Sequence, residues 1–325
     1  MTKKIAIVYE GGAGDTLLFH RFLPAIRNLY GDCKFYGFLN SNGNESQKTI
    51  LNYLYPSSHK ELFTITHKKY KEFVISSQFG EETGMIGYKE NIPDDWMDKI
   101  NSYDVVINGH LDSLDFISQP WEWNKYFNTF PRPEILPENY LGPYMISHLI
   151  SSTSVEHRLQ QFYIDRIVKD LDKLAQELGW QSILISQPEF NEFYDSAMND
   201  CKKTHLLNGS ITEVCDVIVN AKLMVSVDSG FRPVAYPLMP VISFSRQCSA
   251  PNQMPPSHII RWNPVKPYFP LNWNTGDVIR SARNLIKDQT YQIFPELSLT
   301  DESLHTSLIK RDYKINHDKS ILNGN

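Results

Sequence analysis

The sequence is poor in the features that mark secreted, zinc-binding or membrane-spanning proteins. Its 325 residues include only four cysteines, none in a CxxC pair or at a zinc-ligand spacing: Cys33, Cys201, Cys215 and Cys248. No apolar run reaches the roughly 20 residues of a membrane span, and the opening MTKKIAIVYE lacks the apolar stretch of a signal peptide. We therefore expect free thiols in a reducing compartment, and a cytoplasmic protein that does not insert stably into a membrane.

A basic excess is also absent, because the formal net charge is −5 at pH 7. Proteins that bind duplex nucleic acid usually carry such an excess, so a nucleic-acid partner is disfavoured. A negative net charge is still compatible with a single local basic groove. The hydrophobic share of 41% and the charged share of 21% are typical of a globular protein. The length predicts two domains, each able to form its own core.

Two strand-turn-helix segments are the strongest positive signal, and they lie far apart in the chain. They are IAIVYEGGAGDTLLFHRFLPAI at 5–26 and LMVSVDSGFRPVAYPLMPVISF at 223–244. Each is the layout by which a parallel-sheet domain presents a helix N-terminus to an anionic ligand. We predict an α/β protein of two Rossmann-like domains with parallel sheets facing a central cleft. The predicted domains are 1–140 and 141–290, followed by a C-terminal tail at 291–325, and the Trp- and Pro-rich stretch 116–143 is the predicted crossing.

Local patterns predict most of the remaining elements. Strands are expected at 4–9, 33–39, 103–108, 145–151, 182–186, 223–227 and 241–244, and a late helix at 277–288. One helix is predicted from about Asp15 to Tyr30, with a bend at Pro24. Capping-box pairs Thr153/Glu156 and Ser210/Glu213 predict two more helix starts, the first helix running to Leu178 and closed by Gly179. Residues 40–100 show no order that the pattern can define.

The first turn, EGGAGD at 10–15, lacks both the Lys-Ser/Thr of a P-loop and the third glycine of a dinucleotide fingerprint. Gly12 and Gly14 would let a ligand approach the backbone. Asp15 is either the N-cap of the following helix or a carboxylate that serves as a general base. His110 and Asp112, in the loop after strand 103–108, are candidates to line the same edge.

The second turn, Asp228-Ser229-Gly230, is the better candidate for a phosphate site, because a helix N-terminus follows a buried strand. The alternative is again an N-cap. Arg232 is either a cation for a diphosphate or an ordinary surface arginine. Glu189 is a weaker candidate for a sugar hydroxyl. The sequence shows no convincing DxD-like metal site, since Asp94 and Asp95 fit a solvated turn.

These segments together resemble the bacterial heptosyltransferase family of GT-B glycosyltransferases, which move a sugar from a nucleotide-diphosphate donor to a lipopolysaccharide core acceptor. The resemblance is carried by GAGDTLLFHRFLPAI, YDVVINGH, SITEVCDVIVNAKLMVSVDSG and MPVISF, in that order along the chain. Two departures fall on the donor side. Pro233 stands where the family usually has His, and QPEF follows the strand SILIS where the family favours a Gly-Gly turn.

The resemblance implies that Asp15 is the catalytic base, in an acceptor domain at 1–140. Gly12, Gly14, His110 and Asp112 are the candidates, from their positions in the sequence, to line the acceptor side. The resemblance also implies a nucleotide-sugar domain at 141–290, with Asp228, Ser229 and Gly230 at the donor phosphates. Arg232 and Glu189 are assigned to the donor side with them.

The prediction is an inverting, metal-independent glycosyltransferase that needs no cofactor. Its substrates would be an ADP-heptose-like donor and a glycan or lipopolysaccharide-type acceptor. Three alternatives stay open: a transferase acting on protein or DNA, a nucleotide-sugar epimerase, and a degenerate member that binds nucleotide without catalysis. The sequence leaves the sugar, the nucleotide base, the acceptor and the oligomeric state undefined.

Overall fold

The computed structural model describes most of the chain as two compact units. The described residues are 1–9, 13–20, 23–40, 45–65, 69–75, 84–90, 94–108, 133–135, 142–151, 159, 161–227, 229–236, 238–246, 258–262 and 275–288. One unit comprises Met1–Ser118 with Ser298–Asn325, and the other comprises Gln119–Leu297. The boundaries predicted at 140 and 290 lie in or beside stretches outside the described residues, so they stay predictions.

The first unit is built on a parallel sheet of four strands in the order β3-β2-β1-β6. Its elements in chain order are β1 (Lys3–Tyr9), α1 (Ala13–His20), α2 (Leu23–Tyr30), β2 (Cys33–Asn40), α3 (Ser46–Leu54), β3 (Glu61–Ile65), the antiparallel pair β4 (Lys69–Ile75) and β5 (Gly84–Glu90), α4 (Asp94–Asn101) and β6 (Val105–Asn108).

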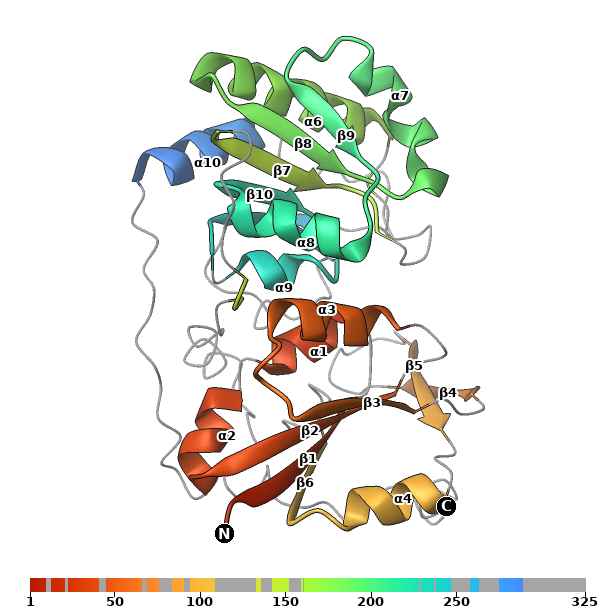
Figure 1. Ribbon diagram of the computed structural model, residues 1–325. Coiled ribbons are helices and arrows are strands. Elements are labelled where there is room, and N and C mark those ends of the chain that lie inside the picture. Colours follow the sequence, from red (N-terminus) through yellow and green to blue (C-terminus); the bar gives the residue numbers. More distant parts are fainter. Residues whose placement is uncertain are drawn as a thin grey trace. The chain divides into compact units, whose positions relative to one another are not determined.

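The sheet of the first unit is buried on both faces, as parallel sheets usually are. Ala6 and Val8 point to one face, where they pack with Ile100 of α4. Tyr9, which alternates with them, contacts Phe19 of α1 on the other face. Figure 1 shows α1 and α3 side by side over this second face, and the two helices are in contact.

The single helix predicted over 15–30 is two helices. α1 ends at His20 and α2 begins at Leu23, so Pro24 occupies the second position of a new helix. A proline in a first turn loses no helical hydrogen bond, because the N–H groups there have no intrahelical acceptor. The predicted bend is therefore a break. Asp94 and Asp95, predicted as a turn, are the first two residues of α4, where carboxylates are favourable.

The second unit holds a larger parallel sheet, in the order β12-β11-β10-β7-β8-β9. Its elements are β7 (Tyr144–His148), α6 (Gln161–Leu178), β8 (Gln181–Ile185), the short 3-10 helix η5 (Pro188–Phe190), α7 (Glu192–Met198), β9 (Thr204–Leu207), α8 (Ile211–Asn220), β10 (Leu223–Ser226), α9 (Arg232–Ala235), β11 (Val241–Arg246), β12 (His258–Trp262) and α10 (Thr275–Asp288). Counted from β7, the strand order is 3-2-1-4-5-6, the doubly wound Rossmann order.

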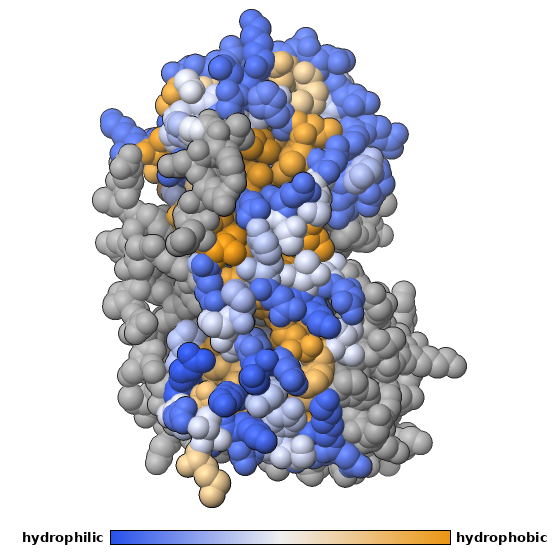
Figure 2. Space-filling view, viewed as in Figure 1, coloured by the Kyte–Doolittle hydropathy of each residue, from blue (hydrophilic) through white to orange (hydrophobic). Residues whose placement is uncertain are grey.

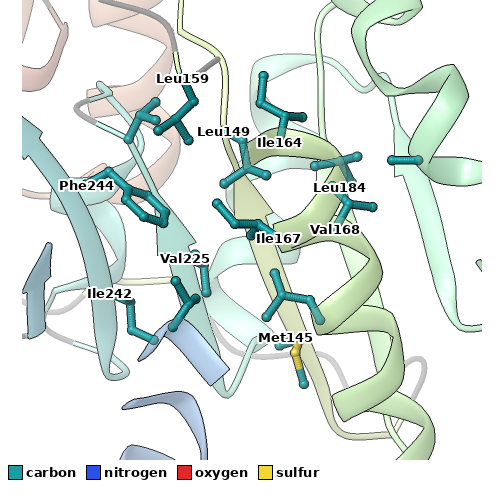
Figure 3. Close-up of a cluster of buried hydrophobic side chains, with 14 of the residues drawn as sticks. Met145, Leu149, Leu159, Ile164, Ile167, Val168, Leu184, Val225, Ile242 and Phe244 are labelled. Carbon is teal, nitrogen blue, oxygen red and sulfur yellow. The ribbon is translucent and has the colours of Figure 1, made fainter. Parts of the chain in front are cut away.

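The core of the second unit lies between the sheet and α6, with α7 and α10 packed beside that helix. Figure 3 shows the apolar side chains that meet there, including Met145 and Val225 from the strands and Ile164, Ile167 and Val168 from α6. Burial of one such side chain stabilises the fold by about 1.5 to 3 kcal/mol.

The predicted capping pair Thr153 and Glu156 lies outside the described residues, and the helix that ends at Leu178, α6, begins at Gln161. Leu159 is not helical and is buried in the core. The Gln161 side chain donates to the Phe193 carbonyl and to Asp165, so tertiary contacts fix this helix end. The predicted stop is confirmed. Gly179 has φ +67°, and the N–H of Trp180 bonds to the carbonyl of Ala175, as in a Schellman motif.

The capping box predicted at Ser210 and Glu213 is confirmed. The Glu213 N–H donates to Ser210 Oγ at 3.4 Å, and the Ser210 N–H donates to Glu213 Oε2 at 2.7 Å. This start directs α8 back along the sheet toward β10.

On the face drawn in Figure 2, the described surface is mainly hydrophilic, and hydrophobic residues appear in scattered areas.

Asp172, on α6, accepts hydrogen bonds from residues at the start of β9. It is 3% exposed, and Oδ1 accepts hydrogen bonds from the backbone N–H groups of Lys202 (3.0 Å) and Lys203 (2.6 Å) and from Thr204 Oγ1 (2.9 Å). Gln176 donates to Oδ2 at 2.5 Å. Burial raises the pKa of Asp172, but these donors outweigh it and hold the pKa below its usual value.

We predict that Asp172→Ala lowers the free energy of unfolding by about 2 to 4 kcal/mol, because the buried Thr204 hydroxyl and three part-buried donors lose their acceptor. Urea titration at pH 7 measures the loss. Asp200→Asn is the matched control, since Asp200 is exposed and its described ion pair, with Lys169 at 2.8 Å, is a surface pair. Equal stability of the two variants would show that the Asp172 hydrogen bonds contribute nothing net.

Candidate functional site

The carboxyl ends of β7 and β10 lie side by side at the centre of the second sheet. Ser226 is in register with His148, and the Val227 N–H donates to the His148 carbonyl at 3.0 Å. The chain leaves β7 toward β8 on one side, and it leaves β10 toward β11 on the other. This is the topological switch point, where open α/β sheets bind their ligands.

The turn after β10 is the segment that sequence reasoning assigned to donor phosphates. Ser226 Oγ donates to the Val227 carbonyl at 2.8 Å and lies 3.3 Å from Ser229 Oγ. The Arg232 N–H donates to the Ser229 carbonyl at 3.2 Å, which closes the turn into α9. Ser229 and Gly230 are partly exposed. Asp228 lies outside the described residues.

Arg232 is the first residue of α9 and is only 3% exposed. Its guanidinium carbon lies 5.8 Å from the centre of the Tyr236 ring, a cation–π distance. The alternative that Arg232 is an ordinary surface arginine is therefore wrong. Pro233 follows as the second residue of α9, a position in the first turn that needs no N–H.

His148 is a feature of this edge that sequence reasoning missed. It is 5% exposed, its ring stands edge-on to Phe231 at 5.5 Å between centres, and its Nδ1 has no hydrogen-bond partner. Burial lowers the pKa of His148 to about 4, so the ring is neutral at pH 7. The available signal was a histidine in the mainly apolar segment MISHLIS, at the end of the strand where ligands bind.

Glu189 follows β8, the neighbour of β7, and lies in η5 with an exposed side chain. Glu189 therefore lies at the same carboxyl edge of the sheet as His148 and Ser226. No described contact joins Glu189 to the β10 turn, so its assignment to a sugar hydroxyl stays a prediction.

The first unit repeats this geometry around β1 and β6, whose ends are in register at Val8 and Asn108. The order β3-β2-β1-β6 again places a switch point between the first strand and its far neighbour. Gly14 and Asp15 are the second and third residues of α1, which begins at Ala13. Asp15 thus lies inside the first helical turn, and its reading as the N-cap is wrong. Gly12, His110 and Asp112 lie outside the described residues.

The described residues show neither a metal-binding cluster nor a helix suited to crossing a membrane. Within the described ranges, no group of three or more His, Cys, Asp or Glu residues is placed to hold a metal ion. Among the helices of the described part of the chain, none has the length and apolarity needed to cross a membrane.

Comparison with known proteins gives structural likeness without sequence likeness. No family model and no curated protein matches the chain. A glycosyl transferase family 9 structure from Veillonella parvula matches with a TM-score of 0.59 and 14% identity, over 88% of this chain and 98% of the other. ADP-heptose lps heptosyltransferase II from E. coli matches with a TM-score of 0.57 and 11% identity, over 88% and 99%. E. coli heptosyltransferase WaaC, in a structure with ADP, matches with a TM-score of 0.53 and 13% identity, over 88% and 97%.

At these identities the likeness shows the fold alone. The chain shares the two-unit α/β fold of these glycosyltransferases, with a parallel sheet in each unit. The predicted α/β class with two Rossmann-like domains of the GT-B type is confirmed.

Proposed function

We propose that this protein is a glycosyltransferase that takes a sugar from a nucleotide-diphosphate donor. The observation that carries the proposal is the buried Arg232 in the turn at the switch point between β7 and β10. A cation held at the ligand-binding edge of a Rossmann sheet suits a diphosphate, because the guanidinium fork matches phosphate oxygens in shape and charge. The structure of WaaC with ADP supports a nucleotide as the occupant.

The donor would be held by the second unit. Its diphosphate would lie near Asp228, Ser229, Gly230 and Arg232, with Glu189 at the sugar. Negative charge builds up on the diphosphate as the bond to the sugar breaks, so a fixed cation there stabilises the transition state more than the ground state. We therefore propose that Arg232 takes the role that a divalent metal has in other glycosyltransferases, and that no metal or cofactor is needed.

The acceptor would be activated by the first unit. Asp15 takes the proton of the acceptor hydroxyl, and the acceptor oxygen forms a bond to the anomeric carbon. The bond from that carbon to the diphosphate oxygen breaks, and its electron pair leaves with the nucleotide diphosphate. One such displacement inverts the anomeric configuration. Gly12, Gly14, His110 and Asp112 would line the acceptor side, which we propose receives a glycan of the lipopolysaccharide-core type in the cytoplasm.

A second candidate is a nucleotide-binding protein without transferase activity. Pro233 favours it, because this residue replaces the histidine of the resembled family and lies buried in the first turn of α9. An epimerase is a further alternative on the same fold, and it would need no acceptor.

The proposal is tested in two stages. A thermal-shift screen across nucleoside diphosphates and nucleotide sugars identifies the donor, since a ligand at 100 times its dissociation constant stabilises by about 2.7 kcal/mol. Release of free nucleotide is then measured with and without candidate acceptors. Release that requires an acceptor supports the transferase, release without one supports the epimerase, and binding with no turnover supports the second candidate.

Arg232→Ala should weaken binding of the nucleoside diphosphate found in the screen by about 1 to 3 kcal/mol, because a charged hydrogen bond is lost. Arg232→Lys keeps the positive charge but lacks the forked guanidinium, so its affinity should lie between those of the wild type and Arg232→Ala. The lysine variant is the test if the alanine variant does not fold. Arg166→Ala is the control, since Arg166 is exposed on α6. Calorimetric binding equal to wild type in both Arg232 variants would remove this residue from the donor site.

Asp15→Asn should lower turnover by about 10²- to 10⁴-fold with little change in donor affinity, because the amide keeps the shape of the carboxylate and loses its basicity. Asp98→Asn, an exposed position on α4 of the same unit, is the control and should keep wild-type turnover. Steady-state assays at saturating donor distinguish the two. Near-normal turnover of Asp15→Asn with the true acceptor would contradict the base assignment.

A further inference from the structure

A cluster of uncharged polar side chains lies beneath α1 in the first unit. Tyr9 Oη and His59 Nε2 are 3.0 Å apart, and His20 Nε2 and Ser58 Oγ are 3.0 Å apart. Tyr9 is the last residue of β1, His20 is the last residue of α1, and Ser58 and His59 precede β3. The two hydrogen bonds therefore join both ends of the segment 9–20 to a single loop.

The rings of this cluster are packed together. His20 and His59 are 5.6 Å apart between ring centres, Tyr55 stacks on His20 at 4.2 Å, and Phe19 meets Tyr9 edge-on at 5.8 Å. The sheet beneath leaves room for them at one position. A Cβ on Gly37 would lie 3.1 Å from His59 Cδ2 and would clash with Leu62 Cδ2, so a larger residue at this position of β2 would require these side chains to shift.

The environment of the two imidazoles disfavours a positive charge. Nδ1 of His20 and Nδ1 of His59 are both buried without a hydrogen-bond partner. Burial, and then the neighbouring His59, hold the pKa of His20 well below 6.5, and burial lowers the pKa of His59 to about 3. Tyr9 is no source of negative charge, because burial raises its pKa.

The titratable and charged groups that face the pair from the described elements offer it no counter-charge. β1 contributes Tyr9, the residue that caps α3 is Tyr55, and β2 contributes Phe35, whose ring contacts His59 at 6.4 Å. From α2, the Arg27 guanidinium lies 5.3 Å from the centre of the Phe35 ring. An imidazolium formed on His20 would face the imidazole of His59, which disfavours its charge.

We propose that Tyr9, His20 and His59 form an imidazole latch, which holds α1 on the sheet only while both histidines are uncharged. Nδ1 of both imidazoles is buried, although the His59 side chain is partly exposed elsewhere. A proton can bind at Nδ1 only after that atom reaches water, which for His20, 1% exposed, requires α1 to move away from the sheet. The latch is thereby a positioning device for α1 and for Asp15, which the same helix carries. Its link to activity rests on the proposed function, whereas the opening of α1 does not.

The direction and size of the pH effect follow from linkage. Both histidines have folded-state pKa values below their opened-state value near 6.5, so opening is unaffected above that pH and becomes easier as the pH falls below it. Each histidine multiplies the opened population by about 10 at pH 5.5 relative to pH 7.5, and two together by about 100.

Hydrogen exchange of the α1 amides at pH 7.5 and pH 5.5, corrected for the intrinsic rates, tests the latch on the full chain. The wild type should show the roughly 100-fold increase, with β1 amides protected at both pH values. His20→Gln and His59→Gln should each reduce the increase to about 10-fold, and the double variant should abolish it, because glutamine can hydrogen-bond where Nε2 does but does not titrate. His205→Gln, at an exposed position of β9, should behave as wild type.

Three results would overturn the proposal. The first is equal pH dependence in α1 and β1, which means that the whole sheet unfolds. The second is an unchanged increase in the double variant. The third, which is decisive if that variant does not fold, is an NMR titration of the wild type in which these two imidazoles titrate near pH 6.5. Turnover should fall in acid in parallel with α1 opening. Normal turnover of Asp15→Asn would refute the catalytic link and leave the exchange result standing.

Discussion

The candidate site of the second unit depends on the parallel pairing of β7 with β10. The two strands are adjacent in the sheet, although the paired positions Met145 and Leu223 lie 78 residues apart in the chain (223 minus 145), in the first and fourth strands of the unit. The connections on either side of this pair run in opposite directions, so no crossover helix covers the carboxyl ends of both strands. His148 and the turn from Ser226 to Arg232 meet there as a result.

Burial acts in opposite ways on the Asp172 carboxylate and on the buried imidazoles. Asp172 is kept charged, because backbone and side-chain donors replace the water it loses. His20, His59 and His148 each keep one ring nitrogen without a partner, and burial keeps them neutral. The carboxylate stabilises the fold at neutral pH. The neutral rings make it sensitive to acid, since an unfolded histidine binds a proton that the folded one cannot.

The parts of the fold that could be read from the sequence are those that local chemistry defines. Alternating and continuous apolar runs locate the strands, and the Ser210–Glu213 pair and Gly179 define helix ends. The start of α6 at Gln161 could not be read, because the Gln161 side chain there donates to the carbonyl of Phe193, a residue far along the chain. Residues 40–100 were equally opaque, since no period dominates a segment that forms short helices, one sheet strand and a separate hairpin.

The candidate site was predictable in the same uneven way. The sequence singled out the segments around Asp15 and Ser229 because small residues follow apolar strands there. It singled out Arg232 because this cation comes soon after the second of these segments. The burial of Arg232 could not be read, because it depends on packing against Tyr236 within a short helix. His148, His20 and His59 carry no motif at all. Their surroundings are known only from the structure, because within each unit the sheet order brings together residues that are distant in sequence.

The two switch points carry different chemistry, and this difference suits the proposed reaction. The described side chains beneath α1 that form the latch are neutral, whereas the turn after β10 leads into a buried cation. A general base works best where neighbouring cations do not depress its basicity, and a departing diphosphate needs positive charge close by. One edge could not meet both needs well, because a cation near enough to hold the diphosphate would also stabilise the carboxylate and weaken it as a base. The proposed assignment therefore draws the base from one Rossmann-like unit and the cation from the other, so that each requirement is met by a different set of side chains.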